Sequence, residues 1–323
     1  MKILLCADVR LGAICTENLE VKLSHKWQAA RTKKLSELID QAAQNNALYV
    51  ALYGQMFGQE RVSETVIDSL FQAVKEDAQI QVLAFLMAEE YNRISYRNDV
   101  PENLHLICLQ TKDTYVDDRL ALRIEKGKTE LQLSDNDSVW ISYVEDKGYV
   151  ISGIGEDKVI PTFEPIGFED AMDTDTGYGI IEWSEEEILG YSYVEDQRYT
   201  FRSTELKILP EDGQKDIVRK INSAVSKLDP DTFLRITIVG KSAFGLILNG
   251  DAMEKHLQTK IFFAEVYDNS IMDIDEEAFV NDISLRSEFV RLALNDDSLS
   301  ESERNRLISC GWNALNGKEV SAE

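Results

Sequence analysis

Acidic or amide side chains follow three short apolar stretches of the sequence. Asp8 comes directly after KILLCA, Gln55 follows ALYVALYG, and Glu89 and Glu90 stand shortly after IQVLAFLM. Such stretches are typical of buried parallel strands, and ligands collect beyond the carboxyl ends of parallel strands. An aspartate there is a possible metal ligand, but Arg10 brings a permanent positive charge two residues away. The pattern therefore leaves two alternatives, a metal site or an ion pair of Arg10 with Asp8 or Glu90.

Two amphipathic segments separate these three stretches. Residues 26–46 place apolar side chains at helical spacing, with Lys and Arg on the other face. Residues 62–77 repeat apolar side chains one turn apart, and Ser63 is a candidate helix cap. The order strand, helix, strand, helix, strand predicts a right-handed parallel α/β unit.

The character of the sequence changes twice further along the chain. From about Asp118, short alternating segments are separated by Gly, Asp and Asn, which predicts a run of strands in a second sheet. The segment GYVISGIGEDK within this run predicts a hairpin. Around Tyr199 the pattern becomes mixed, and a helical tail begins near Asp275. We expect one domain over residues 1–198 and a small α+β domain over residues 199–323.

The composition restricts the classes of function. The 323 residues include 58 acidic and 34 basic side chains, which gives a formal net charge of -24. This charge repels phosphate groups and argues against direct binding of DNA or of a membrane surface. The four cysteines lack C-x-x-C spacing, which argues against a zinc ribbon and a disulfide framework. The apolar N-terminal stretch is too short for a signal peptide or a membrane span, so we expect a cytoplasmic protein.

Several segments together resemble one known family. The opening MKILLCADVRLG resembles the start of calcineurin-like metallophosphoesterases, above all the SbcD-type DNA repair exonucleases, which begin with a strand into D-x-H-L-G. YGQMFGQE is similar to their G-D-x-F-D block, and VLAFLMAEEYNR falls where they carry G-N-H-D. DISLRSEFVRLALND and LSESERNRLISCGWNALNG resemble their C-terminal helices. The similarity covers roughly the first 95 and the last 125 residues. It implies a metallophosphoesterase-like αββα sandwich followed by a small α+β C-terminal domain.

The resemblance also implies two catalytic metal ions held by Asp, His and Asn side chains. This sequence departs from that pattern at most positions. Asp8 matches the first ligand, whereas Arg10 stands at the motif histidine and Gln55 at the bridging aspartate. The asparagine, histidine and aspartate of G-N-H-D correspond to Glu90, Tyr91 and Asn92.

The family's later ligands, an isolated histidine and a G-H-x-H block, have no counterpart here. The chain has three histidines, His25, His105 and His256, and none lies between Leu106 and Lys255. None of the three stands beside a second residue at metal-ligand spacing. The resemblance thus implies vestigial metal-site positions at Asp8, Arg10, Gln55, Glu90, Tyr91 and Asn92.

These departures favour a protein without catalytic residues and without a bound cofactor. We expect a non-catalytic member of the SbcD-like family, or pseudoenzyme, that acts as a structural or regulatory partner. The resemblance implies an SbcC-type coiled-coil ATPase or a catalytic paralogue as its partner. Phe289, Leu292, Trp312 and Leu315 have helical spacing in the tail. They are expected to pack within their own domain, to form a docking surface, or both.

Two other functions stay open at this point. The chain is alternatively an active metal-dependent exonuclease or phosphodiesterase with a reduced site of Asp8, Gln55, Glu89 and Glu90. Carboxylate oxygens of Asp8, Glu89 and Glu90 would then hold Mg²⁺ or Mn²⁺, which accept oxygen ligands. A further alternative is that the acidic surface serves as a decoy for a nucleic-acid-binding protein.

Overall fold

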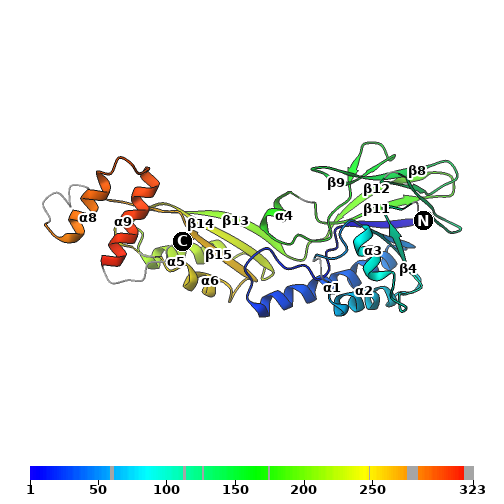
Figure 1. The fold of residues 1–323 in the computed structure, drawn as a ribbon, viewed down its shortest axis with the longest axis horizontal. Helices are drawn as coiled ribbons and strands as arrows, with labels where there is room; N and C mark the ends of the chain where they lie inside the picture. Colours follow the sequence, from blue (N-terminus) through cyan, green and yellow to red (C-terminus); the bar gives the residue numbers. More distant parts are fainter. Residues whose placement is uncertain are drawn as a thin grey trace. The chain divides into compact units, whose positions relative to one another are not determined.

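The chain forms two compact units, Met1–Arg198 and Tyr199–Glu323 (Figure 1). The computed structural model describes residues 1–58, 62–111, 114–125, 127–173, 175–246, 248–274 and 283–315. The fold is mixed α/β, with three sheets and helices in both units. None of the helices among these residues is long and apolar enough to cross a membrane.

The first unit contains a largely parallel six-stranded sheet in the order β12-β11-β1-β2-β3-β4. Its parallel strands are β1 (Lys2–Ala7), β2 (Tyr49–Tyr53), β3 (Gln81–Leu86) and β4 (Leu104–Cys108), and β11 (Gly177–Trp183) and β12 (Ile188–Glu195) join antiparallel. The helices α1 (Val21–Gln44), α2 (Glu64–Lys75) and α3 (Ala88–Ile94) connect the parallel strands. The predicted alternation of strands and helices is therefore confirmed.

The second sheet of this unit is antiparallel and has the order β10-β9-β8-β7-β6-β5. Its strands are β5 (Thr114–Val116), β6 (Ala121–Glu125), β7 (Lys128–Gln132), β8 (Ser138–Val144), β9 (Gly148–Ser152) and β10 (Lys158–Val159). The segment GYVISGIGEDK forms the predicted hairpin, in which Lys158 lies opposite Ile151. A short helix, α4 (Phe168–Asp173), precedes β11.

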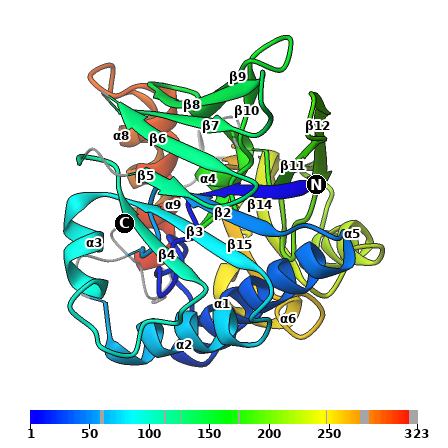
Figure 2. The same cartoon turned by 90° about the vertical axis from the view of Figure 1, so that its right-hand side faces the viewer.

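Alternate residues of the parallel strands face two different cores. On β1, Leu4 and Cys6 pack with the helices, whereas Ile3, Leu5 and Ala7 pack against the second sheet. Figure 2 shows α1 and α2 on one side of the first sheet and β5–β9 on the other. The outer face of the second sheet carries exposed side chains such as Trp140, which is 42% exposed. Within the described residues the layers are thus helix, sheet, sheet, which differs from the expected αββα order.

The second unit is built on a three-stranded parallel arrangement of β13 (Thr200–Ile208), β14 (Thr232–Ser242) and β15 (Phe263–Asp268), with β16 (Ile271–Met272) beside β14. Ile236 and Ile238 of β14 pack with α5 (Gln214–Val225) and α6 (Gly250–Leu257). The tail forms α8 (Leu285–Leu294) and α9 (Glu301–Leu315). Its expected start near Asp275 falls at residues 275–282, which lie outside the described part.

One expectation about α1 is wrong. Arg31 and Lys34 were expected on the exposed face of this helix, but they are only 1% and 3% exposed. Together with Glu164, which is fully buried, they form a group that we call the α1 ion cluster. Glu164 lies 3.9 Å from both cations, and its Oε1 accepts a hydrogen bond of 3.0 Å from the backbone N–H of Arg198.

The cations of the α1 ion cluster also serve buried backbone carbonyls. Arg31 donates to the carbonyl of Val9 at 2.8 Å and to those of Glu164 and Pro165 at 3.0 and 3.1 Å. Lys34 donates to the carbonyl of Phe163 at 2.8 Å. Buried carbonyls need hydrogen-bond donors, and irregular loops have no neighbouring strand or helical turn to provide them. Arg31 and Lys34 supply these donors. The cluster thereby fixes the loop after β1 and residues 163–165 to α1.

Replacing Arg31 with methionine should therefore lower the free energy of unfolding of the first unit by about 3–5 kcal/mol, the usual cost of breaking a buried ion pair. The loss arises because three buried carbonyls would lose their donor and Glu164 would keep Lys34 as its one cation in the cluster. Urea denaturation followed by tryptophan fluorescence measures the change.

Lys33→Met is the matched control for this experiment. The Lys33 side chain is 67% exposed and pairs with Glu37 on the helix surface, so its loss should cost less than about 1 kcal/mol. An Arg31→Met variant as stable as Lys33→Met would show that the loops do not depend on this donor.

Candidate functional site

The loop after β1 lies at the carboxyl edge of the parallel strands and has an unusual backbone. Asp8 and Arg10 have φ angles of 51° and 49°, in the left-handed region that residues other than glycine rarely adopt. Three backbone hydrogen bonds fix this conformation, from Asp8 to Tyr53 at 2.8 Å, from Arg10 to Gln55 at 3.0 Å and from Leu11 to Met56 at 2.8 Å. Such conformations cost about 1–3 kcal/mol each and gather at functional sites.

The guanidinium of Arg10 bridges two carboxylates at this edge. Its Nη1 lies 2.8 Å from Oδ2 of Asp170 in α4, and its Nη2 lies 3.6 Å from Oδ2 of Asp8. Asp170 Oδ2 also accepts a hydrogen bond of 3.0 Å from the backbone of Ile166. Of the two expected partners of Arg10, the structure thus brings Asp8 to it, whereas Glu90 bonds elsewhere. Asp170 begins the acidic segment DAMDTDTG, a signal in the sequence that could have identified it.

The carboxylate of Asp8 is held tightly. Its Oδ1 accepts a hydrogen bond of 2.9 Å from the backbone of Gln55. A Cβ at Gly54 would lie 2.3 Å from that oxygen and 2.8 Å from the ring of Tyr149, so only glycine fits there. Burial raises the pKa of Asp8, although the Gln55 N–H and the charge of Arg10 oppose this rise.

Glu90 lies in the first turn of α3, next to the loop after β2. It is 8% exposed, and its Oε1 accepts a hydrogen bond of 2.9 Å from the backbone of Phe57. Burial raises the pKa of Glu90. Tyr91 packs its ring on the helix-side core, and Asn92 is exposed. The three residues that correspond to G-N-H-D therefore do not converge on one point.

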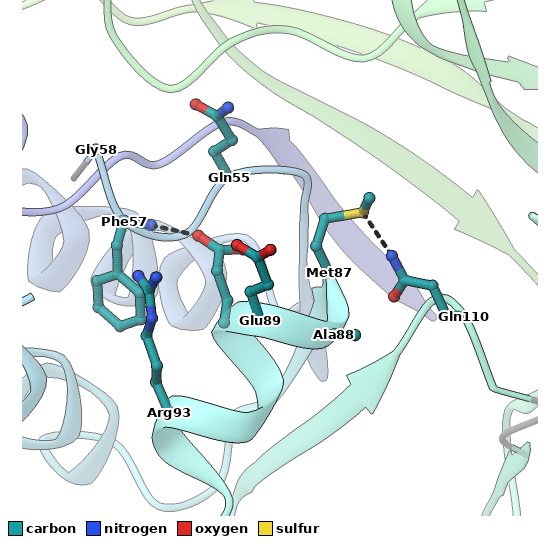
Figure 3. Close-up of a pocket in the computed structure, with 9 residues that line it drawn as sticks. Gln55, Phe57, Gly58, Met87, Ala88, Glu89, Arg93 and Gln110 are labelled. Atoms are coloured by element: carbon teal, nitrogen blue, oxygen red, sulfur yellow. Dashed lines mark hydrogen bonds between the residues drawn. The ribbon is translucent and has the colours of Figure 1, made fainter. Parts of the chain in front are cut away.

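A cavity of about 580 Å³ opens beside Glu90 (Figure 3). Glu89 and Arg93 of α3 line it together with Gln55, whose exposed side chain points away from Glu89. Its other lining residues are Phe57, Gly58, Met87, Ala88 and Gln110. Gln110 donates to the Met87 sulfur at 3.4 Å. The cavity is therefore mixed in charge, with a carboxylate pair and one guanidinium.

Asp8 and Arg10 line a second cavity of about 650 Å³. The β8–β9 hairpin contributes Asp146, Lys147 and Tyr149 to its lining. Burial and the neighbouring charge of Asp8 raise the pKa of Tyr149 to about 12. The hairpin residues were not among the candidates from sequence, because no local pattern indicates which turn of the second sheet approaches Asp8.

The residues present do not fit the two-metal centre that the resemblance implies. Asp8 is engaged by the Gln55 N–H and by Arg10, and the guanidinium beside it repels a divalent cation. Among the residues that the structure describes, no three His, Cys, Asp or Glu side chains lie close enough to share a metal ion. The arrangement is an internal ion pair between Arg10 and the carboxylates of Asp8 and Asp170.

The three histidines lie on three different helices and strands. His25 is exposed on α1, His105 contacts Gln81 at 2.7 Å on β4, and His256 contacts Asn222 at 3.0 Å on α6. Cys6, Cys15, Cys108 and Cys310, all within the described part of the chain, form no disulfide there. Burial raises the pKa of Cys6 to about 12, which keeps this thiol protonated and unsuited to nucleophilic attack.

No protein-family model matches this chain, and no curated protein is similar to it at a significant level. The resemblance to SbcD-type exonucleases therefore rests on the motifs quoted above.

Replacing Arg10 with glutamine should raise the pKa of Asp8 further, because the charge of Arg10 lowers that pKa. A carboxyl with a raised pKa in the folded state contributes stability at low pH that is lost as the pH rises through the folded pKa. In Arg10→Gln this loss should extend to higher pH. Carboxyl-detected NMR titration of Asp8, with urea denaturation at several pH values, measures both effects.

Arg97→Gln provides the control, since Arg97 pairs with Glu64, Asp68 and Asp99. It should leave the titration of Asp8 unchanged. An Asp8 pKa that is equal in Arg10→Gln and in the native protein would contradict the ion pair.

Proposed function

We propose that this protein is a non-catalytic relative of the SbcD-type exonucleases. It acts in the cytoplasm as a structural or regulatory partner of an SbcC-type coiled-coil ATPase or of a catalytic paralogue. The bridge from Arg10 to Asp8 and Asp170 carries this proposal, since it places a fixed cation where the resemblance expects a metal ion. The protonated guanidinium neutralises the carboxylates but activates no water.

We further propose that the first unit is an abbreviated metallophosphoesterase-like sandwich. Two sheets that face each other across one core, with Asp8 at the carboxyl edge of the parallel strands, support this assignment. The exposed outer face of the second sheet is the part that departs from the αββα order.

The helical tail supports the partner role. Phe289 and Trp312 pack within the second unit, where Trp312 contacts Phe244 with ring centroids 4.4 Å apart. Leu285 and Leu292, two helical turns apart on α8, are 73% and 65% exposed. Both interpretations of the tail therefore receive support, because some apolar residues close its own core and others are free to contact a partner.

One observation favours the alternative of a reduced hydrolytic site. Oε2 of Glu90 is buried and, among the described atoms, has no hydrogen-bond partner. A Mg²⁺ or Mn²⁺ ion at this oxygen would give it a partner, but among the described residues Asp8, Glu89 and Glu90 do not lie close enough together to share one ion. We therefore keep the active enzyme as the outcome that would overturn the proposal.

Isothermal titration calorimetry with Mn²⁺ tests the proposal. We expect no saturable binding at millimolar Mn²⁺ to the native protein, and no cleavage of linear double-stranded DNA. The double variant Arg10→His/Gln55→Asp is the positive control, because it restores two ligands that the resemblance implies. Heat of binding in this variant would show that the edge itself still suits a metal ion.

Stoichiometric binding to the native protein that disappears in Asp8→Ala would overturn the non-catalytic assignment. Cleavage of DNA that depends on Mn²⁺ and is lost in the same variant would establish the enzyme instead.

A further inference from the structure

The first sheet ends in an edge strand that carries almost no charge. Residues 188–194 of β12 read ILGYSYV and contain no charged side chain, in a chain that is 28% charged. The edge strands of the second sheet are short, since β5 has three residues and β10 has two. In the second unit, β13 is protected by Arg202, Glu205 and Lys207. β4, the other edge strand of the first sheet, also lacks Asp, Glu, Lys and Arg but has only five residues. β12 has eight residues, of which only Glu195 is charged, so it has the longest uncharged stretch of edge among these strands.

The outer edge of β12 is not used within the described chain. β12 pairs with β11 on one side, and Gly190–Glu195 lie in regular register opposite Glu182–Gly177. Among the described residues, no backbone hydrogen bond outside this ladder involves residues 189–194. Ser192 and Tyr193 are exposed. The strand therefore presents unpaired N–H and C=O groups over a regular stretch.

Natural proteins usually block such an edge with charges, proline or a bulge, because it is a template for pairing with another strand. β12 has one of these features, a register shift between Glu182 and Trp183 that leaves Leu189 without a paired residue. This shift affects the beginning of the strand and leaves Gly190–Glu195 regular. Residues 190–194 carry no charge, no proline and no bulge, which indicates that this part of the edge pairs with another strand.

We propose that β12 pairs with β12 of a second copy of this chain. A twofold axis perpendicular to the sheet places the two strands antiparallel, so that each edge supplies the donors and acceptors that the other lacks. The two sheets would then form one continuous sheet across the dimer. The neutral sequence fits a second copy in particular, because like charges directly opposite each other destabilise antiparallel pairs.

The net charge of each copy gives this dimer a characteristic dependence on salt. Two chains with a charge of -24 repel each other at a distance, and salt screens this repulsion over about 8 Å at 0.15 M ionic strength. The contact itself consists of backbone hydrogen bonds and neutral side chains, which salt weakens little. The dimer should therefore become tighter as NaCl is added, whereas an interface made of ion pairs would become weaker.

Sedimentation velocity of the full chain, from micromolar to several hundred micromolar at low and high NaCl, tests the proposal. We expect a concentration-dependent shift from monomer to dimer that is stronger at high salt. Ser192→Lys and Ser192→Asp should each raise the dissociation constant by about tenfold or more, because each variant brings two like charges into the same antiparallel contact. Thr114→Lys and Thr114→Asp, exposed positions on the edge strand β5, are the matched controls and should leave it within about twofold.

Ser192→Lys and Ser192→Asp change the net charge in opposite directions. An effect that both variants share therefore arises at the strand edge and not from the net charge. Hydrogen exchange of the native protein gives a readout that needs no variant, since amides of residues 190–195 should become protected as concentration rises while those of β5 should not. A monomer under all conditions, a dimer that salt weakens, or a dimer that the Ser192 variants leave intact would overturn the proposal. The outcome does not depend on metal binding, so it is separate from the test of the proposed function.

Discussion

The first unit depends on the three buried charges of the α1 ion cluster. Arg31 and Lys34 project from the middle of α1. They donate hydrogen bonds to backbone carbonyls of the loop after β1 and of residues 163–165. Neither segment is a helix or a strand, so neither can satisfy its own buried carbonyls. Glu164 balances part of the charge and accepts from the backbone of Arg198, the last residue of the unit. One helix face thus fixes three parts of the chain that are far apart in sequence.

This cluster explains how the carboxyl edge of the sheet keeps its strained shape. Val9, whose carbonyl Arg31 binds, stands between the two left-handed residues Asp8 and Arg10. The segment beyond Pro165 leads directly to α4 and so brings Asp170 to Arg10. Because both sides of the ion pair are fixed to the same helix, the left-handed conformations are imposed by their surroundings. The geometry of the site therefore depends on the hydrogen bonds that the α1 ion cluster makes to the loop after β1 and to residues 163–165.

Local patterns were sufficient to predict the elements of the first unit. Apolar runs at KILLCA, ALYVALYG and IQVLAFLM have the composition of strands buried on both faces, and their spacing leaves room for one helix between each pair. The hairpin at GYVISGIGEDK and the placement of Asp8 and Glu90 near the carboxyl edge also follow from order along the chain. These features depend on residues that are close in sequence.

The parts that sequence could not predict depend on distant residues. Arg31 and Lys34 have the helical positions of surface cations, and only the arrival of residues 163–165 more than a hundred residues later buries them. Asp170 reaches Arg10 across 160 residues, and Tyr149 reaches Asp8 from the other sheet. The exposed face around Trp140 was also not predicted, because alternation indicates which residues point inward but not whether a further layer covers the outward ones.

At the carboxyl edge of the parallel strands, contacts within the chain hold both Asp8 and Glu90. A site that binds metal ions keeps its carboxylates unprotonated and exposed to the cation. Here Arg10 supplies the positive charge, the Gln55 N–H holds Asp8, and the Phe57 N–H holds Glu90. Burial raises the pKa of both carboxyl groups, and the backbone hydrogen bonds from Gln55 and Phe57 oppose this rise. The carboxylates at this end of the strands are therefore held by contacts within the chain, and these contacts stabilise the loops after β1 and β2.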